Sequence, residues 1–407
     1  MGKAGLIAGL DVGTTKVCAI VGQVMEEGRM EVLALGSAPS NGLRKGIVVN
    51  IESTVESIVK AIEDVSNTSS VEINSVYVGV AGGHIKSFES YGAVGIKGRE
   101  VSRADLERAL DAAKAVYVPL DREVLHVIPK EYVVDDQEGI INPIGMTGVR
   151  LEAKVQIVTG SVSAVQNLIR CCEKAQLQVV DIVLEPLASS LATLKEDEMK
   201  QGVVMIDIGG GTTDLAFYKK GSLAYTSVIA IGGNHITNDI AIGLRLPVDE
   251  AERVKMAYGA VLPPGSTDSE EIGIMVAGRE RKTIPRSYLY EIISPRCEEL
   301  LELIKAELKK CGAYEEAIYG VVLTGGASQL KGLDRMAEAV LGLPVRVGCP
   351  ENIYGLGDTV ADPKYSTGVG LLMYGAQNEA QPVITGDMFG GILKRMKQWV
   401  KGFLGRQ

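Results

Sequence analysis

The chain has 407 residues, of which 46% are hydrophobic and 23% are charged, a composition that suits a soluble globular protein of two domains. Its net charge of −9 gives no general reason to expect nucleic-acid binding, so any basic site must be local. The six cysteines form no CxxC pair, which favours reduced thiols in a cytosolic protein. Neither a secretory signal nor a run of about 18 apolar residues is visible, so we expect no bilayer-spanning helix.

The first distinctive stretch is a glycine-threonine turn that begins at Asp11. A β-type run ends at this aspartate, the letters "VGTTK" follow, and a second β-type run resumes. Glycines let backbone N–H groups approach phosphate oxygens, and threonine hydroxyls add donors. Hydrated Mg²⁺ prefers one or two carboxylates together with water and phosphate. The stretch therefore predicts a β-hairpin whose tip binds phosphate.

The same pattern returns at residues 207–221, where "DIGGGTTDLAFYKKG" follows the apolar run "GVVMI". One copy alone could equally be a turn without a ligand, but two hairpins that face each other could hold a nucleotide from both sides. A Walker A motif is absent, and the nearest approach to GxGxx[GA] has Val360 at its third small position, so we discount a Rossmann site.

Between the two copies, residues 84–160 read as a strand, a helix and two more strands. Ser102 and Asp105 could begin this helix by capping its N-terminus. The sequence predicts a small α+β insertion here.

Two further segments follow the second copy. A helix predicted from "DEAERVKMAYG" places Glu252 and Lys255 on one face, where they could reach one ligand or, as the spacing alone favours, each other. Downstream, the apolar run that begins at Gly320 predicts a strand, then a turn in which Gly325 and Gly326 allow close approach to a nucleoside, then a helix.

A basic cluster that includes Arg286 and Arg296 precedes and enters a predicted amphipathic helix. It could receive a short acidic peptide through charge-assisted hydrogen bonds. A solvated basic loop is the alternative that the residues alone favour.

The last segment, residues 386–407, predicts an amphipathic helix that lies in a membrane surface. At about 100° per residue, its apolar side chains occupy one arc of roughly 160°. They include Phe389, Ile392, Leu393, Met396, Trp399, Val400, Phe403 and Leu404. Lys394, Arg395, Lys397 and Lys401 fall outside that arc. The helix is too short and too charged to span a bilayer comfortably, although it could instead fold onto the body or onto a partner helix.

The motif order resembles a known superfamily. A phosphate hairpin, "EPLASS", a second phosphate hairpin, "AERVK", "TGGASQLKG" and "ADPKYSTGVGLL" follow one another as in the actin, Hsp70 and sugar-kinase superfamily. Within it, essentially the whole chain is similar to the bacterial FtsA cell-division family. The resemblance implies an actin-like α/β ATPase fold, with two domains around a nucleotide cleft.

The expected boundaries follow from this resemblance. The first domain takes residues 1–83 and 161–200, around an inserted α+β subdomain at 84–160. The second takes 201–375 and includes a peptide-binding subdomain at about 240–315. A flexible linker at 376–385 leads to the membrane helix at 386–407.

The resemblance also implies roles for the site residues. The first phosphate side would be Asp11, Gly13, Thr14, Thr15 and Lys16. The second would be Asp207, Gly209, Gly210, Gly211, Thr212 and Thr213. Gly325, Gly326 and Ala327 would pack against the adenosine, with Glu252 and Lys255 near the ribose. Asp11 and Asp207 are the candidates for water-mediated Mg²⁺ contacts. Glu185 would orient or deprotonate the attacking water, or else form a buried ion pair within the helix packing.

The implied function is an ATP-binding, self-assembling scaffold with slow ATP turnover at most. It would bind the C-terminal peptide of FtsZ at Arg286 and Arg296, help recruit later division proteins, and attach FtsZ filaments to anionic lipid at the cytoplasmic face of the plasma membrane. The alternatives are a type IV pilus assembly protein of the same fold or, less favoured, a kinase of the superfamily. We expect no nucleic-acid partner.

Overall fold

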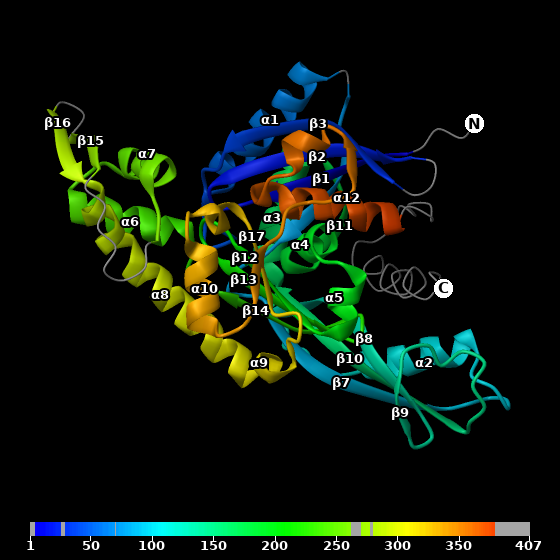
Figure 1. Cartoon of the computed structure of the whole chain (residues 1–407). Coiled ribbons are helices and arrows are strands. Elements are labelled where there is room, and N and C mark those ends of the chain that lie inside the picture. Colours follow the sequence, from blue (N-terminus) through cyan, green and yellow to red (C-terminus); the bar gives the residue numbers. More distant parts are fainter. Residues whose placement is uncertain (1–4, 26–28, 70, 262–269, 277–279, 379–407) are drawn as a thin grey trace.

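The computed structural model describes residues 5–25, 29–69, 71–261, 270–276 and 280–378, and these form two sheet-based domains with an insertion (Figure 1). The first sheet has the order β11-β6-β1-β2-β3-β19. Its strands are β1 (Leu6–Val12), β2 (Lys16–Val24), β3 (Met30–Pro39), β6 (Ser75–Val80), β11 (Gln178–Leu184) and β19 (Ile353–Gly355). A small hairpin, β4 (Leu43–Arg44) and β5 (Ile47–Val48), lies apart from this sheet.

The second sheet has the order β14-β13-β12-β17-β18. Its strands are β12 (Val203–Ile208), β13 (Thr213–Lys219), β14 (Ser222–Ile229), β17 (Val321–Thr324) and β18 (Val345–Val347). A separate hairpin is formed by β15 (Glu271–Val276) and β16 (Glu280–Pro285).

The two sheets repeat one topology. In each, the first three strands form an antiparallel meander, and the fourth strand lies parallel beside the first: β6 beside β1, and β17 beside β12. The fifth strand then pairs in parallel with the fourth. The prediction of a duplicated hairpin is therefore confirmed, and the duplication extends over five strands.

Helices fill the space between the sheets and cover their outer faces (Figure 1). α4 (Glu185–Thr193) and α12 (Ser366–Asn378) pack against each other, α12 against β1 and β2, and α4 against β12 and β13. α1 (Ile51–Thr68) and α3 (Val162–Lys174) belong to the core of the first domain. The core of the second domain includes residues of α6 (Gly233–Leu244), α7 (Val248–Tyr258), α8 (Arg286–Lys310), α9 (Ala313–Glu316) and α10 (Leu333–Leu341). α5 (Glu196–Gln201) and α11 (Gly357–Val360) are short connecting helices.

The insertion forms its own sheet, in the order β7-β10-β8-β9, with one helix. Its elements are β7 (Lys86–Gly95), α2 (Arg103–Lys114), β8 (Arg122–Val134), β9 (Gln137–Ile140) and β10 (Arg150–Ser161). The expected strand-helix-strand-strand unit therefore gains one short strand, β9. The predicted capping at Ser102 and Asp105 is confirmed as a reciprocal capping box. α2 and one face of the sheet enclose a separate apolar core.

The expected end of the second domain at residue 375 is wrong. β19 pairs in parallel with β3, and α12 packs against β1 and α4, so the chain has already returned to the first domain. The apolar residues of α12 complete the first core, which explains the return. α12 also continues to Asn378, so the first three residues of the expected linker are helical. The rest of the linker and the expected membrane helix lie outside the described residues.

Candidate functional site

The two hairpin tips have the same turn geometry. The N–H of Gly13 donates to the carbonyl of Lys16, and the N–H of Gly209 donates to the carbonyl of Thr212, both at 3.0 Å. In each case the glycine lies two residues after the aspartate, Asp11 or Asp207. The duplicated sequence therefore produces a duplicated loop.

These tips face and touch each other. A Cβ placed on Gly210 would lie 1.9 Å from Thr15 Oγ1, and one placed on Gly211 would lie 2.6 Å from Thr14 Oγ1. Glycine allows this approach, because a side chain at either position would force Thr14 or Thr15 to move. The structure thus brings together the two loops that the sequence assigned to the two phosphate sides.

The N-terminus of α6 joins the second tip. The N–H groups of Gly233 and Asn234 donate to the carbonyls of Gly209 and Gly210, at 2.9 and 2.8 Å. Thr15 Oγ1 donates to the side-chain oxygen of Asn234 at 3.3 Å, which links the first tip to the same helix. These two N–H groups are taken by the tip itself, so α6 would favour a phosphate group there only through the positive end of its helix dipole.

Two buried aspartates stand behind the tips. Asp207 accepts hydrogen bonds from Ser189 Oγ at 2.6 Å and Thr367 Oγ1 at 3.3 Å, and burial raises its pKa to about 6. Burial also raises the pKa of Asp11, against the effect of Lys16, whose Nζ lies 3.8 Å from the carboxylate. Both carboxyl groups are short of solvation, as expected for groups that become stable anions when a cation is bound.

A third acid, Asp214, was not predicted as a site residue. It pairs with Asp207 across the hairpin, and Thr212 Oγ1 donates to its Oδ2 at 3.1 Å. Burial, and then the charge of Asp207, raise its pKa to about 8, and its Oδ1 has no hydrogen-bond partner among the described residues. The sequence signal was the second aspartate in "DIGGGTTD"; the equivalent position of the first hairpin holds Cys18.

Glu185 is the first residue of α4 and lies near this acidic group. Burial and the negative charges of Asp11, Asp214 and Asp207 raise its pKa well above the usual range for a glutamate. Within the part of the chain that the structure describes, no basic side chain forms an ion pair with Glu185. The helix-packing ion pair considered as the alternative is therefore not observed, and the surroundings favour the neutral acid.

The residues predicted to lie near the ribose and the adenosine also come together. Lys255 Nζ lies 2.7 Å from Glu252 Oε2 and donates to Thr237 Oγ1 at 2.8 Å, so the ion pair that the spacing favoured is present. Lys255 Nζ also donates to the carbonyl of Gly233 at 3.2 Å, and a Cβ on Gly233 would lie 3.2 Å from that of Ala327. One wall of the candidate site is thus formed by α7, the start of α6 and the glycine turn.

The glycine turn closes directly on the second aspartate. Gly325 has φ of +84°, and a Cβ there would lie 2.2 Å from Asp207 Oδ1. Gly326 opens a 3₁₀ helix (Gly326–Gln329) that precedes α10, where the sequence had predicted one helix directly after the turn.

A segment before α12 supplies further unpredicted contacts. The Lys16 ammonium lies 4.6 Å from the ring centre of Tyr365, and that of Lys364 lies 4.9 Å from it. Lys16 Nζ has no hydrogen-bond partner among the described side chains and backbone. The motif "ADPKYSTG" contained Lys364, Tyr365 and Thr367, but no spacing rule connected them with the hairpins. Across the described ranges no group of three or more His, Cys, Asp or Glu side chains could hold a metal ion by itself.

The two residues predicted to bind an acidic peptide, Arg286 and Arg296, lie on α8. Each already forms an ion pair within the chain. Arg296 binds Asp239 of α6 through two hydrogen bonds, of 2.6 and 3.1 Å, and also contacts Glu299. Arg286 contacts Glu270 at 2.5 Å and the ring of Tyr290. An incoming acidic peptide would therefore have to compete with these carboxylates.

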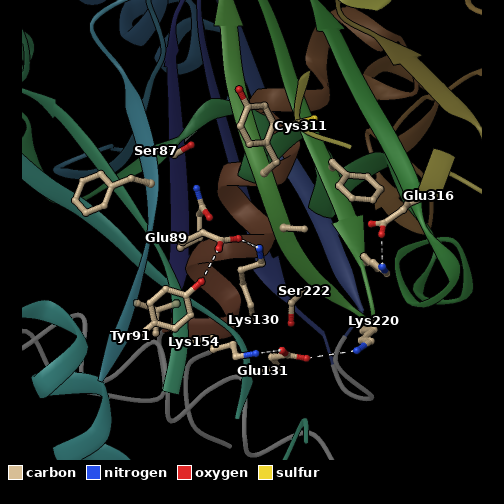
Figure 2. A pocket seen from close by; sticks show the side chains of 17 residues that line it. Ser87, Glu89, Tyr91, Lys130, Glu131, Lys154, Lys220, Ser222, Cys311 and Glu316 are labelled. Carbon is tan, nitrogen blue, oxygen red and sulfur yellow. Dashed lines mark hydrogen bonds and ion pairs between the residues drawn. The ribbon is translucent and has the colours of Figure 1, made fainter. Parts of the chain in front are cut away.

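A cavity of about 530 Å³ lies between the insertion and the second domain (Figure 2). No sequence pattern predicted it. Charged side chains of the insertion pair along one wall: Lys130 with Glu89, and Lys154 with Glu131 at 2.9 Å. Lys220 of the second domain reaches Glu131 of the insertion at 3.4 Å. The insertion therefore contacts the second domain as well as the first. Among the described helices, none is long and apolar enough to cross a membrane.

Comparison with known proteins gives concordant results. The sequence model of the family "Cell division protein FtsA" matches residues 204–370, and that of the "SHS2 domain inserted in FTSA" matches 82–159. The chain is 47% identical to cell division protein FtsA of Pseudomonas aeruginosa over 98% of both chains. It is 42% identical to that of Neisseria meningitidis serogroup B over 97% of this chain and 98% of the relative.

Solved structures share the fold at low identity. The PilM-PilN type IV pilus biogenesis complex has a TM-score of 0.67 at 18% identity, over 92% of this chain and 99% of the other. MreB5 of Spiroplasma citri bound to ADP has a TM-score of 0.52 at 16% identity, over 90% and 94%. A MamK double helical filament has a TM-score of 0.51 at 14% identity, over 93% and 99%. The predicted actin-like fold is confirmed.

Proposed function

Because this chain belongs to the FtsA family of bacterial cell-division proteins, we propose that it is an ATP-binding, self-assembling scaffold that attaches FtsZ filaments to the cytoplasmic face of the plasma membrane at the division site. It would also help to recruit later division proteins. The family supports the role in division, and residues of this chain support nucleotide binding, attachment to lipid and binding of the FtsZ peptide.

The observation that carries nucleotide binding is the pair of similar loops in contact in front of buried carboxylates. Each loop offers backbone N–H groups and threonine hydroxyls, and the N-terminus of α6 adds its positive end. Behind them, Asp214 Oδ1 and Lys16 Nζ are buried without hydrogen-bond partners in the described chain, as expected of groups that await a charged ligand. The similarity to an actin-like protein bound to ADP agrees with this proposal.

The acids suit Mg²⁺, which takes few protein carboxylates and retains waters and phosphate oxygens. Asp11 and Asp207 would contact it through water molecules, and the cation would neutralise phosphate charge. Glu185 would orient the attacking water through its carboxyl group. Its surroundings favour the neutral form, which is a poor base, so we expect slow turnover at most.

Attachment to lipid is assigned to residues 386–407, beyond the described residues. This segment carries five basic residues and one acidic residue, for a net charge of +4, which leaves −13 on the rest of the chain. Anionic lipid would repel the body and attract the tail, at about 1 kcal/mol per basic residue near the surface. Several tails presented by one polymer bind far more persistently than one, which gives self-assembly a role in attachment.

Binding of the FtsZ C-terminal peptide is assigned to α8, where Arg286 and Arg296 could exchange their present carboxylate partners for those of the peptide. The pilus-type alternative rests on a shared fold at 18% identity, whereas relatives at 42–47% identity over nearly the whole chain are cell-division proteins. We therefore favour the division role.

Co-flotation tests this proposal. FtsZ filaments formed with GTP are mixed with vesicles that contain anionic lipid, with or without this chain and ATP. We expect FtsZ in the floating fraction only when the chain is present, and a loss of FtsZ, but not of the chain, with the double variant Arg286→Ala, Arg296→Ala. If the chain floats and FtsZ stays behind, the proposed adaptor role is wrong.

A further inference from the structure

We propose that His126 is a positioning residue through which the inserted subdomain holds the start of α4, and with it the acidic group of the nucleotide site. The inference rests on the proposed nucleotide site and adds a residue that the motifs do not include. His126 lies on β8 of the insertion, outside both hairpins.

The contact itself is a buried hydrogen bond between two subdomains. His126 is 5% exposed, and its Nε2 accepts the backbone N–H of Leu184 at 3.0 Å. An accepting Nε2 carries no proton, so the neutral ring must hold its proton on Nδ1. Burial lowers the pKa of His126 to about 4, which keeps the ring in this neutral form at physiological pH.

Leu184 joins a strand of the first domain to the helix that carries Glu185. It is the last residue of β11 and the residue before α4, whose N-terminus has no side-chain cap. The next residue is Glu185, and one turn later Ser189 donates to Asp207 at 2.6 Å. A displacement of Leu184 would therefore move both Glu185 and the hydroxyl that fixes Asp207.

His126 also touches the helix that precedes the tail. Its ring meets that of Tyr374 on α12 edge to face, with the ring centres 6.3 Å apart. Tyr374 in turn donates to Asp181 Oδ2 of β11 at 3.2 Å. The insertion, the strand that leads into α4 and the last described helix thus meet at one imidazole. A change in any of them has a direct contact through which to reach the acidic group.

Three full-length variants separate positioning from packing. His126→Leu keeps similar bulk and leaves the Leu184 N–H without an acceptor. His126→Gln can place its amide oxygen near the position of Nε2 and restore the acceptor. Val127→Ala is the matched control, because Val127 belongs to the insertion's own core on the other face of β8.

Two readouts are measured for each variant after thermal unfolding shows that it is folded. They are the affinity for a fluorescent ATP analogue with Mg²⁺, and hydrogen exchange in peptides that cover residues 178–193. We expect His126→Leu to bind the analogue roughly tenfold more weakly, a size typical of coupling between sites. Its amide hydrogens at 182–185 should exchange faster. His126→Gln should stay within about twofold of the wild type in affinity, and Val127→Ala should behave likewise at both readouts.

Equal affinity and exchange in wild type and His126→Leu would overturn the proposal, as would an equal loss in Val127→Ala, which would indicate general loosening. A failure of His126→Gln to restore either readout would also count against it. If the wild type itself binds no nucleotide, the proposed function fails, whereas the exchange comparison still decides whether His126 holds the start of α4.

Discussion

At the scale of single residues, the site is a group of acids that the fold keeps from water. Burial raises the pKa of Asp207 to about 6 and that of Asp214 to about 8, and neighbouring carboxylates add to the shift at Glu185. Such groups gain most from a bound cation, because it replaces the solvation that burial removed.

This electrostatic state predicts a pH dependence of nucleotide binding. Mg²⁺ requires the carboxylate anion, and Asp207, with a pKa of about 6, holds a proton below that pH. The affinity for Mg²⁺ and ATP should therefore rise from about pH 5 to pH 7. Titration calorimetry over this range checks it, with Asp207→Asn expected to bind weakly at every pH. A flat wild-type profile would show that Asp207 does not titrate in the complex.

A second residue-scale prediction concerns Gly325. A methyl group there would lie 2.2 Å from Asp207 Oδ1, and the φ of +84° disfavours any side chain. Gly325→Ala should cost about 1–3 kcal/mol of stability and reduce nucleotide affinity at least tenfold, since the carboxylate must move. Gly326→Ala is the neighbouring control for stability, because its methyl group would meet only Lys364 Cβ, at 3.7 Å. Equal melting temperatures of the two variants would contradict this account.

Among the secondary-structure elements, the two repeated hairpins were predicted from the sequence. Site residues that depend on contacts between segments far apart in the chain were missed. The two hairpins were predictable because glycines, threonines and an aspartate follow an apolar run in both. Asp214 was missed because a single acid at the start of β13 resembles an ordinary strand residue. Ser189 and Thr367 became site residues only because α4 and α12 pack together between the sheets.

The predicted end of the second domain was wrong for a similar reason. Nothing in the composition of residues 350–378 distinguishes a helix that ends the second domain from one that completes the core of the first. That choice is made by apolar residues of α12 such as Leu371 and Leu372, which are fully buried against the first sheet. Pairings of this kind depend on contacts between residues far apart in sequence, and local patterns do not encode them.

The link between α6 and α8 gives an element-scale prediction. Asp239 holds Arg296 in a bidentate pair, so it competes with an acidic peptide for the same guanidinium. Asp239→Asn should strengthen binding of the FtsZ C-terminal peptide, and Arg296→Ala should weaken it by roughly tenfold. Fluorescence anisotropy with a labelled peptide measures both. Changes in the same direction in the two variants would show that Arg296 does not contact the peptide.

At the scale of the whole molecule, the insertion joins the two domains. His126 contacts the first domain at Leu184, while Ser87 Oγ donates to the carbonyl of Thr226 in the second at 2.9 Å. Lys220 and Glu131 add an ion pair between the insertion and the second domain beside the cavity of Figure 2. A rotation of one domain against the other must therefore change the contacts of the insertion, which gives nucleotide a route to a distant surface.

On the proposed function, residues 386–407 would connect this body to lipid, and nucleotide-dependent assembly would make a weak anchor persistent. Flotation with vesicles that contain anionic lipid tests this proposal, with the full chain compared to a chain that ends at Thr385, each with and without ATP. We predict that only the full chain floats, that ATP increases the floating fraction, and that Asp207→Asn floats without this increase. If the two chains float equally, or if neither floats, residues 386–407 are not the membrane anchor and the account is contradicted.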